Sequence, residues 1–175
     1  LFNLVTPASV LGGSDLLQRR KSTLGETLDG LPGVSSTGFG PNASRPVIRG
    51  LDSDRVRILQ NGTGVQDASS LSNDHAVALD PLAVDRIEVV RGPAVLLYGG
   101  SAVGGVVNAL DNRIPQEGVS GVSGRAEARY GGAEREKAGA MVLEVGNGSF
   151  NVHADAYARD TDDLAVKGLN VSARR

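Results

Sequence analysis

The residues that could take part in chemistry are few and lie far apart. The chain has two histidines and no cysteine. His75 follows Asp74 in a polar stretch, residues 63–78. His153 lies two residues before Asp155, so the side chains of His153 and Asp155 point to the same face of an extended strand. Taken by itself, a loop histidine such as His75 is explained by a local hydrogen bond. The polarity of its strand face explains His153, which we do not assign to a metal.

The same scarcity argues against an enzyme. A covalent mechanism needs a nucleophile with an activating base. The chain has no cysteine and no serine framed by glycines as in a nucleophile elbow. A calcium loop at Asp52 and Asp54 also lacks the required spacing and its distant glutamate. We therefore do not expect an enzyme.

Composition narrows the classes of protein further. A net charge of −2 and a pI of about 5.7 give no basic surface for nucleic acid. The 24 glycines among 175 residues are about twice the usual share, while aromatic residues make up only 3%. With 40% hydrophobic residues the chain is too apolar to be wholly disordered. No apolar run approaches the ~20 residues of a membrane-spanning helix.

Short elements with clear boundaries precede Pro115. Thr23 and Glu26 form a capping box for a short helix, and Asp80 before Pro81 starts another helical turn. Alternating or apolar runs predict strands at residues 46–50, 55–59, 86–91 and 103–107, with an Asn61-Gly62 turn after the second. The sequence thus predicts a small α+β domain with a mixed sheet. Residues 63–78 form a loop longer than the ~12–15 residues that are common, so we expect it to be functional or disordered.

The pattern changes beyond Pro115. Residues 122–130, 139–145 and 150–159 alternate apolar and polar side chains and are joined by Gly-rich turns. Three strands of about ten residues with one apolar face are typical of an outer-membrane β-barrel. A water-soluble antiparallel sheet has a similar pattern, so a soluble ligand-binding or adhesion module stays open as an alternative.

Several motifs resemble the plug of TonB-dependent transporters. They are Leu31-Pro32-Gly33-Val34, Val47-Ile48-Arg49-Gly50, Arg55 to Leu59, and a long block from Arg86 to Asn108 with fixed glycines at 92, 99, 104 and 105. The resemblance covers roughly residues 22–115. It implies a plug with a mixed four-stranded sheet and short helices over residues 1–117. Residues 118–175 would then be about three antiparallel strands that begin, and do not complete, a transmembrane β-barrel in the outer membrane.

Three charged residues lie within or beside the apolar strands of this region. Arg49, Glu88 and Arg91 need partners or water there. A solvated strand face is one explanation. The resemblance implies another, in which these residues make plug–barrel contacts with charges on the inner barrel wall.

A narrower resemblance concerns the cargo. The segments from Ser72 to Ala76 and from Asp111 to Pro115 are similar to the zinc-uptake branch of the family. This implies that Asp74 and His75 are metal ligands, completed by barrel residues, and that zinc is a transported ligand while no cofactor is required. A siderophore or haem receptor is the alternative, but residues 63–78 contain no aromatic residue and no arginine for a large chelate. Copper and nickel also suit imidazole.

The resemblance also implies the partners of the plug. They are the TonB energy-transducing complex, the remainder of the protein's own barrel, the outer membrane and a metal ion, with no nucleic acid. Residues 1–20 contain no recognisable TonB-contacting segment. We expect the plug to occlude the barrel, open to the periplasm, and to gate energy-coupled import.

Overall fold

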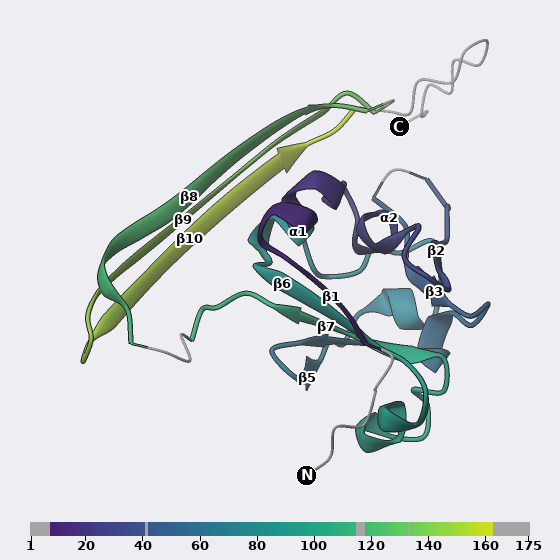
Figure 1. The fold of residues 1–175 in the computed structure, drawn as a ribbon. Coiled ribbons are helices and arrows are strands. Elements are labelled where there is room, and N and C mark those ends of the chain that lie inside the picture. The colour runs from purple at the N-terminus through teal and green to yellow at the C-terminus, as the bar shows by residue number, and fades with distance from the viewer. Residues whose placement is uncertain (1–7, 41, 115–117, 133, 163–175) are drawn as a thin grey trace. The chain divides into compact units, whose positions relative to one another are not determined.

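The computed structural model describes residues 8–40, 42–114, 118–132 and 134–162 (Figure 1). The chain divides into two compact units, residues 1–111 and 112–175. The predicted boundary between residues 117 and 118 lies at the edge of positions 115–117, which are outside the described residues, as are residues 163–175.

The first unit is built on a mixed sheet with the strand order β1-β6-β7-β4-β5. β4 and β7 run parallel, and the other neighbouring strands run antiparallel. The predicted α+β fold with a mixed sheet is confirmed. Three of the predicted strands, at residues 55–59, 86–91 and 103–107, lie in this sheet as β4, β6 and β7. The sheet has five strands and not the expected four, because β1 and the two-residue β5 join it, and β5 forms where the chain returns from the Asn61-Gly62 turn. The strand predicted at residues 46–50 pairs instead in a separate two-stranded ribbon. The strand bounds are Ala8–Gly12 (β1), Val56–Gln60 (β4), Thr63–Gly64 (β5), Arg86–Val90 (β6) and Gly105–Leu110 (β7).

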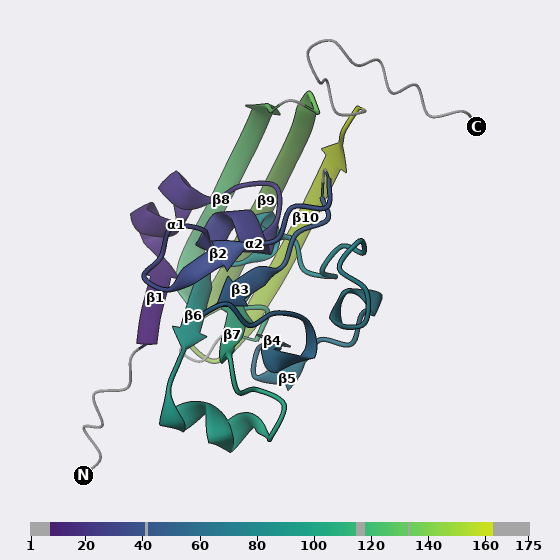
Figure 2. The same ribbon diagram turned by 90° about the vertical axis from the view of Figure 1, so that its right-hand side faces the viewer.

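Two short helices and a two-stranded ribbon lie in front of this sheet in the view of Figure 2. The Thr23 hydroxyl accepts from the Glu26 N–H at 3.2 Å, which confirms the predicted cap. Asp80 accepts from the Leu82 N–H at 2.9 Å beside Pro81, as predicted. None of the helices in the described segments is both long and apolar enough to cross a membrane. The bounds are Gly13–Arg19 (α1), Leu24–Leu28 (α2), Val34–Ser36 (β2) and Pro46–Ile48 (β3), with 3-10 turns Ser53–Arg55 (η1), Ala68–Ser70 (η2), Pro81–Ala83 (η3) and Pro93–Tyr98 (η4).

The strand alternation gives this sheet two apolar faces. One face carries Ile87, Val89 and Val107, which belong to a core shared with α1, α2, β2 and β3. The other carries Val106, which packs with Val95 of η4 in a smaller cluster. Close approach requires glycine at 105, because a Cβ there would lie 2.6 Å from the Cδ1 of a core isoleucine, Ile48. Packing on both faces therefore fixes β7 at the centre of the unit.

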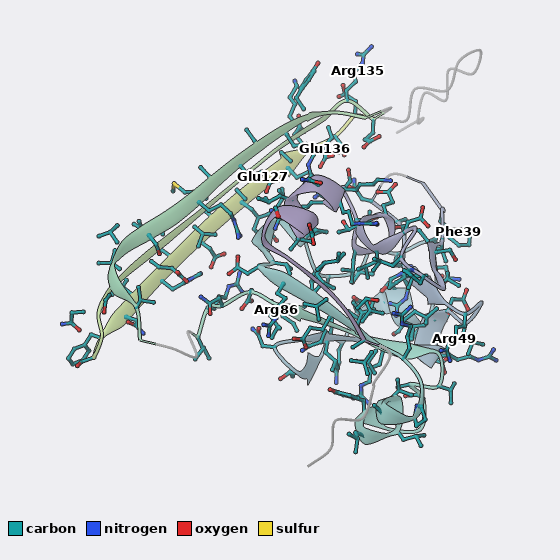
Figure 3. The ribbon with its side chains drawn as sticks, viewed as in Figure 1. Phe39, Arg49, Arg86, Glu127, Arg135 and Glu136 are labelled. Atoms are coloured by element: carbon teal, nitrogen blue, oxygen red, sulfur yellow. The ribbon has the colours of Figure 1, made fainter. Side chains whose placement is uncertain are left out.

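The second unit is a three-stranded antiparallel sheet in the order β10-β9-β8. Its strands are Ser120–Gly131 (β8), Glu136–Asn147 (β9) and Asn151–Asp160 (β10). The register aligns Val122 with Val145 and Val145 with Val152, so one face of the sheet is apolar, as predicted. These apolar side chains are exposed in the described chain, Val122 to 74%. Glu127 and Glu136, labelled in Figure 3, lie on the opposite, polar face.

Candidate functional site

The predicted ligands Asp74 and His75 lie together at the surface of the first unit. The His75 Nδ1 is 2.9 Å from the Asp74 Oδ1, and the two side chains are 54% and 66% exposed. The two side chains thus contact each other, and both are accessible to solvent. Its geometry accommodates both predictions for His75, a local hydrogen bond and a metal ligand.

The electrostatics of the pair favour an ionised carboxylate. A hydrogen bond from the Ser72 hydroxyl, followed by the one from His75, holds the pKa of Asp74 below its usual value. A carboxylate must be deprotonated to bind a metal ion, so this environment keeps one ligand available in weakly acidic solution. Among the described residues, no group of three or more His, Asp, Glu or Cys side chains could hold a metal. The loop offers two ligands, and a strong site needs others.

The loop that carries the pair is more ordered than the sequence indicates. Residues 63–78 include β5 and η2, and the Asp67 carboxylate accepts from the N–H of Ser69 at 3.0 Å and of Ala78 at 2.8 Å. Asn73, next to Asp74, is bonded to Ser53 at 3.0 Å. Sequence reasoning missed Asp67 and Asn73. The position of Asp67 two residues before Ser69 could have predicted this contact, because an aspartate carboxylate readily accepts a hydrogen bond from the backbone N–H two residues later.

The second motif of the zinc resemblance, residues 111–115, has structural roles in the described residues. Asp111 is buried and accepts from Gln60 at 2.8 Å and from Asn61 at 2.7 Å. These bonds join the end of β7 to the turn after β4. Asn112 donates to Glu144 at 2.7 Å, and Arg113 donates two bonds to Asp155 at 3.0 and 3.1 Å within the second unit. Pro115 lies outside the described residues.

His153 lies between two carboxylates on the polar face of the three-stranded sheet. Its Nδ1 is 3.3 Å from Glu144 and its Nε2 is 3.4 Å from Asp155. The side chain is only 8% exposed. The two nitrogens face different carboxylates, so these groups do not converge on one point. The arrangement agrees with the polarity of the face as the explanation for this histidine.

The structure places the three predicted plug–barrel residues differently. Arg49 is exposed and projects away from its unit (Figure 3). Glu88 is partly buried and pairs with Arg86 at 3.0 Å. Arg91 is buried and donates to the carbonyl of Pro32 and the hydroxyl of Ser9 within its own unit. Arg49 thus presents its charge to the outside, whereas Arg91 holds β1 and the α2–β2 connection against the end of β6.

Comparisons with known proteins agree with this fold. A family model described as TonB-dependent Receptor Plug Domain matches residues 1–106. The vitamin B12 transporter BtuB of Photobacterium profundum is 29% identical over 98% of the chain and 30% of its own length. A hemin receptor of Yersinia pestis is 33% identical over 93% of the chain and 22% of its own length. The chain therefore spans under a third of the length of these relatives.

A solved structure gives the same result for the fold. The copper transporter OprC superposes with a TM-score of 0.71 at 21% identity, over 89% of the chain and 24% of that structure. At this identity the match shows a shared fold. A match over 89% of the chain extends beyond either of the two units taken alone. The chain belongs to the TonB-dependent receptor plug domain family, whose members are transporters and receptors of the outer membrane, with the plug inside a barrel, and not enzymes.

Proposed function

We propose that this chain is the plug of an energy-coupled importer of metal ions, and that zinc is its cargo. The observation that carries the proposal is the exposed Asp74–His75 pair with its ionised carboxylate. Carboxylate oxygen and imidazole nitrogen are both zinc ligands, and residues of the surrounding barrel would supply the others. The resemblance of residues 72–76 and 111–115 to zinc-uptake plugs supports the same cargo.

The plug would act as a gate and carry out no reaction. The TonB complex of the inner membrane would supply energy to displace it, and the protein's own barrel would enclose it in the outer membrane. Arg49, Glu88 and Arg91 are the proposed plug–barrel contacts, of which Arg49 is exposed for such a role. Arg91 would contribute indirectly, because its side chain is buried within the plug.

The test is zinc binding and uptake by the complete receptor in outer-membrane vesicles. We expect Asp74→Ala and His75→Ala each to weaken saturable zinc binding at least tenfold, because each removes one of about four ligands. Asp29→Ala, which changes an exposed aspartate elsewhere in the plug, is the matched control and should bind as wild type. Unchanged binding in both ligand variants, with an intact barrel, would leave the cargo of the plug unassigned.

A haem or siderophore receptor is the second candidate. The relation to a hemin receptor favours it, at 33% identity. The absence of aromatic and arginine side chains from residues 63–78 disfavours a large planar chelate at this loop. The same vesicles should distinguish the two: haem binding that survives Asp74→Ala and His75→Ala, together with no zinc binding by wild type, would select the haem receptor. Cu²⁺ in place of zinc tests the identity of the ion, since copper often binds such ligands more tightly.

A further inference from the structure

One carboxylate, that of Asp67, joins the two ends of the loop that carries Asp74 and His75. Asp67 Oδ2 accepts from the N–H of Ala78 at 2.8 Å, eleven residues further along the chain. Its Oδ1 accepts from the Ser69 N–H at 3.0 Å and also from the Ser69 hydroxyl. Asp67 therefore joins the two ends of the segment that contains the proposed ligands.

A buried arginine connects Asp67 and Ser69 to the rest of the plug. The Arg45 side chain is 3% exposed, and its Nη1 lies 3.6 Å from Asp67 Oδ1 and donates to the Ser69 hydroxyl. Its Nη2 donates to the carbonyls of Ser53 at 3.2 Å and Val56 at 3.3 Å. One guanidinium thus connects the loop to η1 and the start of β4. Desolvation lowers the pKa of Arg45, but from an ordinary value so high that the guanidinium stays charged.

A second attachment lies directly beside the proposed ligands. The Ser53 hydroxyl donates to Asn73 Oδ1 at 3.0 Å, and Asn73 Nδ2 is 3.5 Å from Asp52 Oδ2. Ser53 has φ +54°, a left-handed conformation that is uncommon outside glycine, asparagine and aspartate. Such a conformation persists where the surroundings hold it, and here both Arg45 and Asn73 contact Ser53.

Apolar packing contributes little to the middle of this loop. Val65 and Val77, near its ends, pack partly against the core, whereas Leu71 in between is 90% exposed. A cavity of about 180 Å³ has walls from the loop, including Gln66 and Ser70, and from β4. The polar contacts of Asp67 and Asn73 thus tie the segment that carries Asp74 and His75 to the rest of the plug.

We propose that Arg45, Asp67 and Asn73 are positioning residues that hold Asp74 and His75 for the metal ion. The inference rests on the proposed function of that pair. A pre-positioned pair loses less conformational entropy on binding, so releasing it should lower zinc affinity without removing a ligand. Direct hydrogen-bond partners of metal ligands commonly contribute 10–100-fold in affinity, so we expect the lower end of that range for residues that hold the segment that carries the ligands.

The experiment compares Asp67→Asn, Asn73→Ala and Ser53→Gly in the complete receptor. Ser53→Gly removes the hydroxyl while glycine adopts the positive φ without strain, so it should fold even if Asp67→Asn does not. Amide hydrogen exchange of residues 71–76 is measured without metal, and zinc affinity is measured by titration in vesicles. Asp29→Asn is the control for loss of one carboxylate charge. Each variant is repeated in an Asp74→Ala, His75→Ala background.

We expect faster exchange at residues 71–76, unchanged exchange in β6 and β7, and about tenfold weaker zinc binding, with no further loss in the ligand-free background. Wild-type exchange, wild-type affinity with faster exchange, or a further loss in that background would each overturn the inference. If Asp74→Ala, His75→Ala itself binds zinc as wild type, the proposed function fails and the inference fails with it. If that variant loses zinc while the loop variants keep it, only the positioning role is wrong.

Discussion

The plug and the three-stranded sheet use the same kinds of residue in opposite ways. In the plug, the apolar positions of β4, β6 and β7 that belong to the main core are buried, as for Ile87 and Val89 at 0% exposure. In β8 to β10 the apolar positions are exposed, with Val122 at 74% and Met141 at 60%. Water would oppose so large a continuous apolar face, whereas a lipid bilayer would favour it. The comparison indicates that the plug is stable through its own packing and that the sheet depends on what surrounds it.

The dimensions of the exposed face agree with a membrane. Tyr130 pairs with Lys137, and Phe150 lies opposite Asn147, so ten positions of β9 separate the two aromatic residues. Ten residues at about 3.4 Å each span about 34 Å along the strand. With a tilt near 45° this becomes about 25 Å, which is the height of the apolar band between the aromatic girdles of outer-membrane barrels.

The largest effect should come from deleting a buried side chain of the plug. Ile87→Ala should destabilise the plug by about 3–4 kcal/mol, because it leaves a cavity in the core that β6 shares with the helices. Met141→Ala, its exposed counterpart in β9, should cost under about 1 kcal/mol. Urea unfolding of the complete receptor, followed by amide exchange in β6 and β7, measures the difference. Equal losses would mean that the sheet has a core of its own.

Replacing a strand glycine by alanine should also have different effects on stability in the plug and in the three-stranded sheet. Gly105→Ala places a Cβ 2.6 Å from Ile48 Cδ1 and 3.1 Å from the Val90 carbonyl, and overpacking of this kind costs about 3 kcal/mol. In Gly139→Ala the nearest atom would be the Glu127 carbonyl at 3.6 Å, an ordinary contact. Thermal unfolding of both variants is the measurement. A tolerated Gly105→Ala would show that β3 and β7 can separate without cost.

Substituting a buried charged residue of the plug should lower its stability, whereas substituting an exposed one should not. Arg91→Ala should destabilise the plug by about 2 kcal/mol, because it removes the hydrogen bonds to Ser9 and Pro32. Arg49→Gly should leave stability unchanged, since Arg49 is exposed and its φ of +53° suits glycine. Denaturant titration checks both. If the stabilities of these variants were reversed, the assignment of Arg91 to internal bonding would be wrong.

The smallest effect concerns the pH dependence of the proposed metal pair. Ser72→Ala should raise the pKa of Asp74 towards its ordinary value, because the hydroxyl contributes most to lowering it. A carboxylate with a lowered pKa stays ionised as the pH falls, until the pH reaches that lowered pKa. As the pH falls, zinc binding by the variant should therefore begin to weaken at a higher pH than in wild type. Near neutral pH the two affinities should differ by under about twofold, because Asp74 is ionised in both proteins. Zinc titrations between pH 4 and 7 test this, and identical profiles would exclude the Ser72 contact.

Local signals in the sequence predicted much of the plug. Thr23 before its helix, the Asn61-Gly62 turn and the alternation of residues 86–90 each act over a few positions, and the structure has an element at each of them. The strands from Ser120 to Asp160 follow from alternation alone.

Contacts between distant residues could not be predicted in this way. Asp67 is ordered by Arg45, 22 residues away, and by Ala78, so the polar composition of residues 63–78 suggested only a loop. The inward direction of Arg91 depends on Pro32 and Ser9, which no local pattern connects to it. Asp74 and His75 were identified by resemblance, and their contact was not predictable from composition.

The position of β1 has a mechanical consequence. β1 lies at the edge of its sheet, and β6 is the one described strand that pairs with it, over five residue pairs. A force applied ahead of Ala8 along the strand would load these bonds in shear and share the load among them, whereas a force across the strand would break them one after another. Detaching β1 would leave the pairing of β6, β7 and β4 intact, because none of the strands in the described residues other than β6 pairs with β1. The sheet is thus built so that traction on its first strand can be relieved without pulling apart the centre.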